Sequence, residues 1–102
     1  METYRRKRVE IVVERARAPA ILGRIRELGA TGYTLIPDVS GQGRRGMMGG
    51  GEVFDTYRTV MILVIAQEDL ARTLLAEVHA LLENYTGIVY LSDVEVVRAD
   101  HF

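Results

Sequence analysis

The sequence has no cysteine, no large excess of either charge and no long hydrophobic segment. The missing cysteines exclude disulfides, thiolate metal ligands and thiol nucleophiles. The formal net charge of −1 argues against a general nucleic-acid binder, which is usually clearly basic. The longest strongly apolar stretch, residues 60–66, is far too short to cross a bilayer. No apolar run follows the basic N-terminus, as it would in a signal peptide. We therefore expect a cytoplasmic protein.

The chain has 102 residues and is 48% hydrophobic, which is enough for one domain with one core. We expect residues 1–102 to form that single domain. A monomer of this size leaves much of its apolar surface in contact with water, so oligomerisation is expected. Four consecutive basic residues lie near the N-terminus, at positions 5–8. We interpret this basic run as a solvent-exposed arm.

Hydrophobic residues recur with two different periods, which predict the order of strands and helices. Alternating apolar residues at positions 9–13 predict a first strand. Pro19 suits the first turn of a helix. Apolar residues at helical spacing continue that helix as far as Gly29, which is a stop signal. Residues 33–36 then predict a second strand.

Neither period holds over residues 38–54, and after them the same order of elements repeats. Residues 57–65 predict a third strand that is apolar on both faces. Glu68 and Asp69 suit the positively polarised N-terminus of a second helix, and apolar residues line one side of that helix. A last strand is predicted from residue 87 to about residue 97.

The predicted order is two β-α-β units joined by a long loop. Two such units form an α+β, ferredoxin-like sandwich, in which both helices cover one face of a four-stranded sheet. The third strand is apolar on both faces, yet the predicted helices cover only one. We therefore expect a second copy of the same sheet to cover the other face in a homo-oligomer.

The long loop, at about residues 38–56, is expected to be flexible and to carry the binding chemistry. Its central run, residues 40–51, is S-G-Q-G-R-R-G-M-M-G-G-G. Glycines allow successive N–H groups to turn toward one anion. Arg44 and Arg45 offer planar forks for phosphate or carboxylate oxygens. A connection this long is usually functional or disordered, so two interpretations stay open: an anion-binding loop that orders on binding, or a disordered tether with solvated arginines.

Three short motifs follow one another along the chain: G-Y-T-L at residues 32–35, G-Q-G-R-R at 41–45 and Y-T-G-I-V-Y at 85–90. With the two β-α-β units, these motifs resemble the PII-like signal-transduction proteins. The resemblance is to the branch linked to bicarbonate transport and carboxysomes in autotrophic bacteria. It spans nearly the whole chain, residues 9–98.

The resemblance implies a homotrimer with three clefts between neighbouring subunits. Those clefts would bind an adenine nucleotide (ADP, AMP or cyclic AMP), with bicarbonate sensed alongside it. Gly32 and Thr34 would meet adenine, and the residues of the long loop would meet phosphate. Residues 87–89 would form a wall from the neighbouring subunit. An arginine near the end of the last strand would add one more cation. The implied nucleotide-binding residues are Gly32, Thr34, Gly41, Gly43, Arg44, Arg45, Gly87, Ile88, Val89 and Arg98.

Signals for catalysis or for a bound metal are weak, since no metal-spaced histidine pair or serine elbow occurs. We therefore expect no catalytic residues, no metal and no cofactor. The expected function is a regulatory sensor of inorganic-carbon or energy state, which signals through the loop to a bicarbonate transporter, a carbon-fixation protein or an enzyme. We expect no nucleic-acid partner and no membrane insertion.

Two other functions stay open on related scaffolds. One is a divalent-cation-binding trimer, which would need clustered histidine, cysteine or carboxylate side chains. The other is an acylphosphatase-like hydrolase, which would need an arginine in the first loop, such as Arg15 or Arg17. That hydrolase would also need a nearby asparagine to position water, and Asn84 is the chain's single asparagine.

Overall fold

A computed structural model describes residues 1–45, 51–54 and 58–102 of the chain. Its elements alternate between strands and helices, with two short 3-10 turns (η1 and η2). In chain order the elements are β1 Tyr4–Glu14, η1 Arg15–Arg17, α1 Ala18–Glu27, β2 Thr34–Ile36, β3 Gly41–Arg45, β4 Gly51–Phe54, β5 Thr59–Ala66, α2 Glu68–Leu81, β6 Gly87–Val96 and η2 Ala99–His101.

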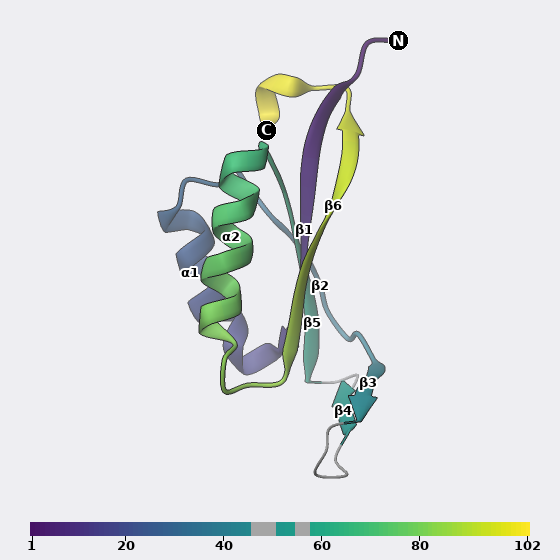
Figure 1. The fold of residues 1–102 in the computed structure, drawn as a ribbon, viewed down its shortest axis with the longest axis vertical. Coiled ribbons are helices and arrows are strands. Elements are labelled where there is room, and N and C mark those ends of the chain that lie inside the picture. The colour runs from purple at the N-terminus through teal and green to yellow at the C-terminus, as the bar shows by residue number, and fades with distance from the viewer. Residues whose placement is uncertain (46–50, 55–57) are drawn as a thin grey trace.

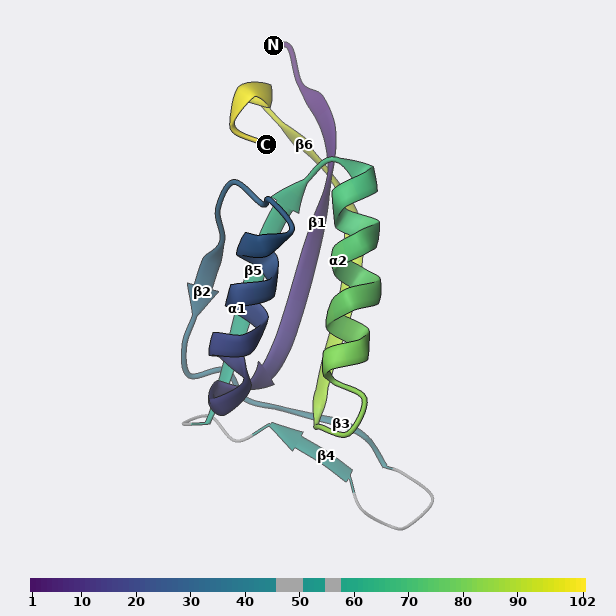
Figure 2. The ribbon, with the colours of Figure 1, turned by 90° about the vertical axis from the view of Figure 1, so that its left-hand side faces the viewer.

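Four of the strands form one sheet in the order β2-β5-β1-β6, and every neighbouring pair is antiparallel. Both helices pack against the same face of this sheet (Figure 1, Figure 2). This confirms the predicted α+β, ferredoxin-like sandwich. Gly29 follows the end of α1 with a φ of 93°, a conformation that favours glycine, so the predicted stop signal is confirmed.

The core lies between the sheet and the two helices, where alternate residues of β1 and β5 meet apolar residues of α1 and α2. Burying these side chains removes apolar surface from water, which is the main favourable term in folding. The largest fully buried apolar side chains of this core are Val9, Ile11, Val13, Ile21, Ile25, Val60, Ile62, Val64, Leu74 and Val78. The alternation predicted for the first strand therefore places its valines and isoleucine in the core.

The other face of the sheet is not covered by the helices, and we call it the open face. Successive strand residues point to opposite faces, so the residues that alternate with the core residues along each strand lie on the open face. One row across the four strands consists of Ile36, Met61, Val12 and Ile88. Ile36 is 41% exposed and Ile88 is 42% exposed. This row of the open face is thus apolar, as the two-sided pattern of the third strand predicted.

Residues 5–8 differ from the expectation of a solvent-exposed arm, because they belong to β1. Each of them pairs with a residue of β6, from Arg5 with Glu95 to Arg8 with Ser92. Lys7 forms an ion pair with Asp93 of β6, and its side chain is only 17% exposed. Main-chain hydrogen bonds and a charged pair therefore extend the sheet where no apolar alternation predicts a strand.

The segment at 38–54 also differs from the expectation of no regular element. Strands β3 and β4 pair as an antiparallel hairpin, in which Gly41 lies opposite Phe54 and Arg45 opposite Gly51. The register is irregular between Gln42 and Arg45. Strands pair through main-chain hydrogen bonds, which need no particular period of side chains. A glycine-rich sequence can therefore form this ladder although it has no apolar pattern that predicts a strand. Residues 46–50 and 55–57 lie outside the described part of the chain.

Candidate functional site

Gly87 and the long-loop residues of the implied site lie at one end of the sheet. Gly87 is directly opposite Val13, where β1 ends. The chain that leads into the β3–β4 hairpin reaches the same end, because the Val39 N–H donates to the Thr59 carbonyl at 3.1 Å. The hairpin therefore leaves the sheet at the end where β5 and β6 both begin (Figure 2). The side chains of Arg44 and Arg45, and the position of Gly43 relative to any ligand, lie outside what the structure describes.

Gly32 and Arg98 lie near each other at the opposite end of the sheet. The hydroxyl of Thr31, which precedes Gly32, donates to the His101 carbonyl at 2.7 Å. Arg98 immediately precedes the turn η2, which contains His101. Both Gly32 and Arg98 are exposed. The structure therefore joins the two segments that carry Gly32 and Arg98, at the end of the sheet opposite the hairpin and Gly87.

Thr34 and Ile88 both lie on the open face, but at its two opposite edges. Thr34 belongs to the edge strand β2 and Ile88 to the edge strand β6, with β5 and β1 between them. Three inter-strand spacings separate these edges by about 14 Å. Val89, next to Ile88, points the other way and packs against the core. A site that places these two residues side by side therefore needs two chains.

The two glycines at the ends of the implied site have different surroundings. A Cβ atom added at Gly87 would lie 3.1 Å from the Val12 carbonyl oxygen and 3.1 Å from Val13 Cγ1. A Cβ at Gly32 would meet nothing within 4 Å. Packing inside the chain therefore explains Gly87, whereas no contact in the described chain requires glycine at position 32.

Sequence reasoning missed two charged contacts at the hairpin end of the sheet. The Arg17 Cζ atom lies 4.2 Å from the centre of the Tyr85 ring, within the range of a cation–π interaction. Arg15 Nη2 lies 3.1 Å from Asp38 Oδ1. Tyr85 begins the motif that contains Gly87, and an aromatic residue at this position was the signal in the sequence that could have indicated a contact with a cation. Arg17 and Tyr85 thus connect the first loop to the start of β6.

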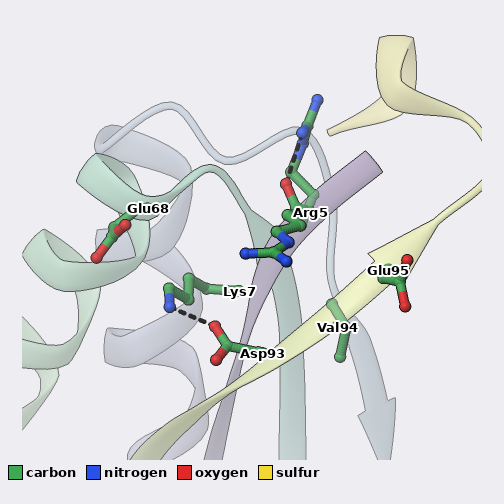
Figure 3. A pocket seen from close by; sticks show the side chains of 7 residues that line it. Arg5, Lys7, Glu68, Asp93, Val94 and Glu95 are labelled. Carbon is green, nitrogen blue, oxygen red and sulfur yellow. Dashed lines mark hydrogen bonds and ion pairs between the residues drawn. The ribbon is translucent and has the colours of Figure 1, made fainter. Parts of the chain in front are cut away.

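A hollow of about 610 Å³ lies beside the extended ends of β1 and β6, near the N-terminus of α2 (Figure 3). Three basic and three acidic residues line it together with Val94: Arg5, Arg6, Lys7, Glu68, Asp93 and Glu95. The Lys7 ammonium donates a hydrogen bond to the Asp93 carboxylate and holds the pKa of that carboxyl below its ordinary value. The balanced charges give this hollow little attraction for a phosphate group.

Metal-binding clusters and membrane-spanning helices are both absent from the part of the chain that the structure describes. Within residues 1–45, 51–54 and 58–102, no group of three or more histidine or carboxylate side chains could hold a metal ion. Among the same residues, no helix is both long enough and apolar enough to cross a membrane.

Comparisons with known proteins agree with this architecture. The family model described as nitrogen regulatory protein P-II matches residues 6–101. No curated protein matches the sequence. A solved structure of CPII from Thiomonas intermedia K12 bound to ADP and bicarbonate is 26% identical, with a TM-score of 0.85 over 99% of this chain and 97% of that one. A second CPII structure, bound to ADP, AMP and bicarbonate, is 28% identical, with a TM-score of 0.79 over 95% and 98%.

A PII-like signalling protein from Thermus thermophilus is also 28% identical, with a TM-score of 0.79 over 100% of this chain and 99% of that one. These likenesses extend over the full sandwich and are not confined to one motif. The family match likewise leaves only residues 1–5 and residue 102 uncovered. This chain therefore belongs to the nitrogen regulatory protein P-II family.

Proposed function

We propose that this P-II family protein is a non-enzymatic sensor that binds ADP or AMP, together with bicarbonate, in clefts between the subunits of a homotrimer. The observation that carries the proposal is the full-length similarity to CPII, whose solved structures are bound to ADP, AMP and bicarbonate. At 26–28% identity the similarity spans at least 95% of this chain.

The apolar open face supports the homotrimer. Ile36, Ile88 and Tyr90 are each more than 40% exposed on one side of the sheet. Exposed apolar surface of this kind marks an interaction site, and a second copy of the same sheet offers a matching surface. In such an assembly the β2 edge of one chain can approach the β6 edge of the next, which would complete a site containing both Thr34 and Ile88.

The residues of the cleft would divide the ligand between them. Gly32 and Thr34 would contact the adenine side. The main chain at Gly41 and Gly43 and the guanidinium groups of Arg44 and Arg45 would hold phosphate. Ile88, with the main chain of its neighbours Gly87 and Val89, would form the opposing wall, and Arg98 would add a cation. Bicarbonate, a small planar anion, suits the same arginine forks.

The signal would leave the protein through the β3–β4 hairpin, which projects from the end of the sheet (Figure 2). A loop that gains contacts to a ligand can order and present a new surface. The proposed target protein is a bicarbonate transporter or a carbon-fixation protein, because the two ligands together report the energy state and the level of inorganic carbon.

Isothermal titration with ADP, AMP, cyclic AMP and ATP, each with and without bicarbonate, tests the ligand class. Micromolar binding of ADP or AMP, strengthened by bicarbonate, is the expected result. Light scattering on the same sample should return three times the 11.4 kDa chain mass. A tenfold preference for ATP over ADP would contradict the proposed ligand, and a monomeric mass at micromolar concentration would remove the intersubunit cleft.

A further inference from the structure

A single guanidinium holds the C-terminal turn η2. Arg6 Nε donates to the main-chain oxygen of Phe102 at 3.0 Å, and Arg6 Nη2 donates to the Ala99 carbonyl at 3.3 Å. The third nitrogen, Nη1, donates to the Arg5 carbonyl at 2.7 Å. A guanidinium is planar and carries its N–H donors in fixed directions. The hydrogen bonds to Ala99 and Phe102 therefore hold the turn against β1, the strand that carries Arg6, and the bond to Arg5 orients the guanidinium.

A second contact joins the same turn to the loop between α1 and β2. Thr31 Oγ1 donates to the His101 carbonyl at 2.7 Å, and Gly32 is the next residue along the chain. Within the turn, the His101 N–H donates to the Arg98 carbonyl at 3.2 Å. The N-terminal half of β1, the Gly32 loop and the turn that begins at Arg98 are thus one hydrogen-bonded unit.

The turn has little stability of its own. It is a 3-10 turn of three residues, Ala99–His101, and none of its residues is buried. Short 3-10 segments have poor hydrogen-bond geometry and depend on contacts with their surroundings. Arg98, which caps the turn, has non-helical backbone angles of −124° and 81° and is exposed. The direction in which Arg98 leaves the sheet therefore depends on where the turn is held.

We propose that Arg6 is a positioning residue of the nucleotide site, which holds η2 so that Arg98 and the Gly32 loop stand in a fixed relation to each other. This inference rests on the proposed function, in which Gly32 and Arg98 both face the ligand. Arg6 itself need not touch the nucleotide. Its three main-chain acceptors engage all three guanidinium nitrogens, and Arg98 is the arginine that would face the ligand.

The proposal predicts a loss of affinity without a loss of fold. The hydrophobic core lies between the sheet and the helices, and Arg6 is not part of it. Without Arg6 the turn would occupy its position only part of the time. The apparent dissociation constant rises in inverse proportion to the competent fraction, so a turn in place about a tenth of the time weakens binding about tenfold.

The test compares Arg6→Ala with Arg5→Ala, a matched control that removes the neighbouring exposed arginine. ADP titration should show roughly tenfold weaker binding for Arg6→Ala and a change of less than about twofold for Arg5→Ala. The ¹⁵N order parameters of residues 99–102, measured without nucleotide, should fall only in Arg6→Ala. Arg6→Lys should recover part of the affinity, because an ammonium can still donate a hydrogen bond to one carbonyl. The recovery should be incomplete, because an ammonium cannot span two carbonyls as a planar guanidinium does.

Each remaining outcome decides the question. Wild-type ADP affinity in Arg6→Ala, with lowered order parameters at residues 99–102, would overturn the positioning role and leave the proposed function intact. Unchanged order parameters would show that Arg6 does not hold the turn, which also overturns it. If the wild type bound no adenine nucleotide, the proposed function would fail and the role of Arg6 with it. If Arg6→Ala did not fold, Thr31→Val would replace it, with the same expected loss of ADP affinity.

Discussion

Glu10 of β1 and Tyr90 of β6 lie directly opposite each other on the open face, and the Tyr90 hydroxyl donates a hydrogen bond to the Glu10 carboxylate. Glu10 is only 9% exposed, and Arg8 Nε lies 2.8 Å from its other carboxylate oxygen. The hydrogen bond to the carboxylate raises the pKa of the Tyr90 phenol, because it favours the protonated form. A small polar cluster thus lies on the open face beside the apolar row of Ile36, Met61, Val12 and Ile88.

Replacing Tyr90 by phenylalanine should destabilise the protein. The substitution keeps the ring but removes the hydroxyl donor, so that among the described residues the largely buried Glu10 carboxylate keeps only Arg8 as a partner. A hydrogen bond to a charged group contributes about 1.5–3 kcal/mol, and partial exposure of Tyr90 places the expected loss near the lower end, at about 1.5 kcal/mol. Urea unfolding at one fixed protein concentration measures it. Tyr33→Phe, at another exposed tyrosine, is the control, and an equal loss in both variants would contradict the role of the pair.

Much of the sandwich could be predicted because its core strands alternate. Val9, Ile11 and Val13 occupy every second position, and a strand must place them on one face. The third strand was predictable from its β-branched residues, and Gly29 from the need for a positive φ after α1. These signals are local, so a single sequence contains them.

The features that could not be predicted depend on contacts between distant residues. Residues 5–8 join the sheet because β6 reaches as far as Val96, and nothing in the basic run itself indicates that partner. Arg6 contacts Phe102, 96 positions away. The separation of Thr34 and Ile88 onto opposite edges follows from strand order, which two motifs in a sequence do not specify. The implied site could thus be named by residue but not arranged in space.

Alanine at Gly87 should lower the stability of the protein, whereas alanine at Gly32 should lower only its ADP affinity. At Gly87 the new methyl group would lie 3.1 Å from the Val12 carbonyl oxygen and 3.3 Å from Leu82 Cδ1. Forcing β1 and β6 apart should cost about 1–3 kcal/mol of stability. At Gly32 the methyl group has open space in the chain, so stability should be unchanged while ADP affinity falls if Gly32 faces the ligand.

Thermal unfolding and ADP titration on both variants separate the two roles. The Gly87 variant should melt several degrees lower than the wild type. The Gly32 variant should melt at the same temperature as the wild type. Wild-type ADP affinity in Gly32→Ala would remove Gly32 from the proposed site. Wild-type stability in Gly87→Ala would show that the strand edge yields more easily than its contacts indicate.

The pH dependence of stability should include a contribution from the ion pair between the helices. Arg24 Nη2 of α1 lies 2.9 Å from Glu77 Oε1 of α2, and Arg24 Nε lies 3.4 Å from Glu77 Oε2. These hydrogen bonds and the positive charge lower the pKa of Glu77. Because the pKa is lower in the folded than in the unfolded protein, the stabilisation is fully present above the ordinary value of about 4.3. It is lost as the pH falls through the lowered pKa of the folded state.

An NMR titration of the Glu77 carboxyl carbon in the wild type and in Arg24→Gln measures this directly. The pKa of Glu77 should rise toward its ordinary value in the variant. The stability difference between the two proteins should shrink as the pH falls below about 4.3. Arg72→Gln, which removes the exposed pair with Glu68 on α2, should leave the pKa of Glu77 unchanged. An unshifted Glu77 in Arg24→Gln would contradict the assignment of the cause.

Arg45 should be the stronger of the two loop arginines for nucleotide binding. It ends β3, where its main chain pairs with Gly51, and its side chain lies outside what the structure describes. A charge-assisted hydrogen bond to phosphate contributes about 1.5–3 kcal/mol. Arg45→Ala should therefore weaken ADP binding roughly ten- to a hundredfold and leave the oligomeric mass unchanged.

Arg44→Ala is the matched control, because it removes the same charge one position earlier. It should cost less ADP affinity if Arg44 faces bicarbonate or a protein partner. Hydrogen exchange across residues 38–56 gives a second measurement, since ligand contacts should raise protection there in the wild type and much less in Arg45→Ala. Wild-type nucleotide binding in both variants would make the loop a partner-docking arm, and the phosphate contacts would then have to come from Arg98 and the main chain.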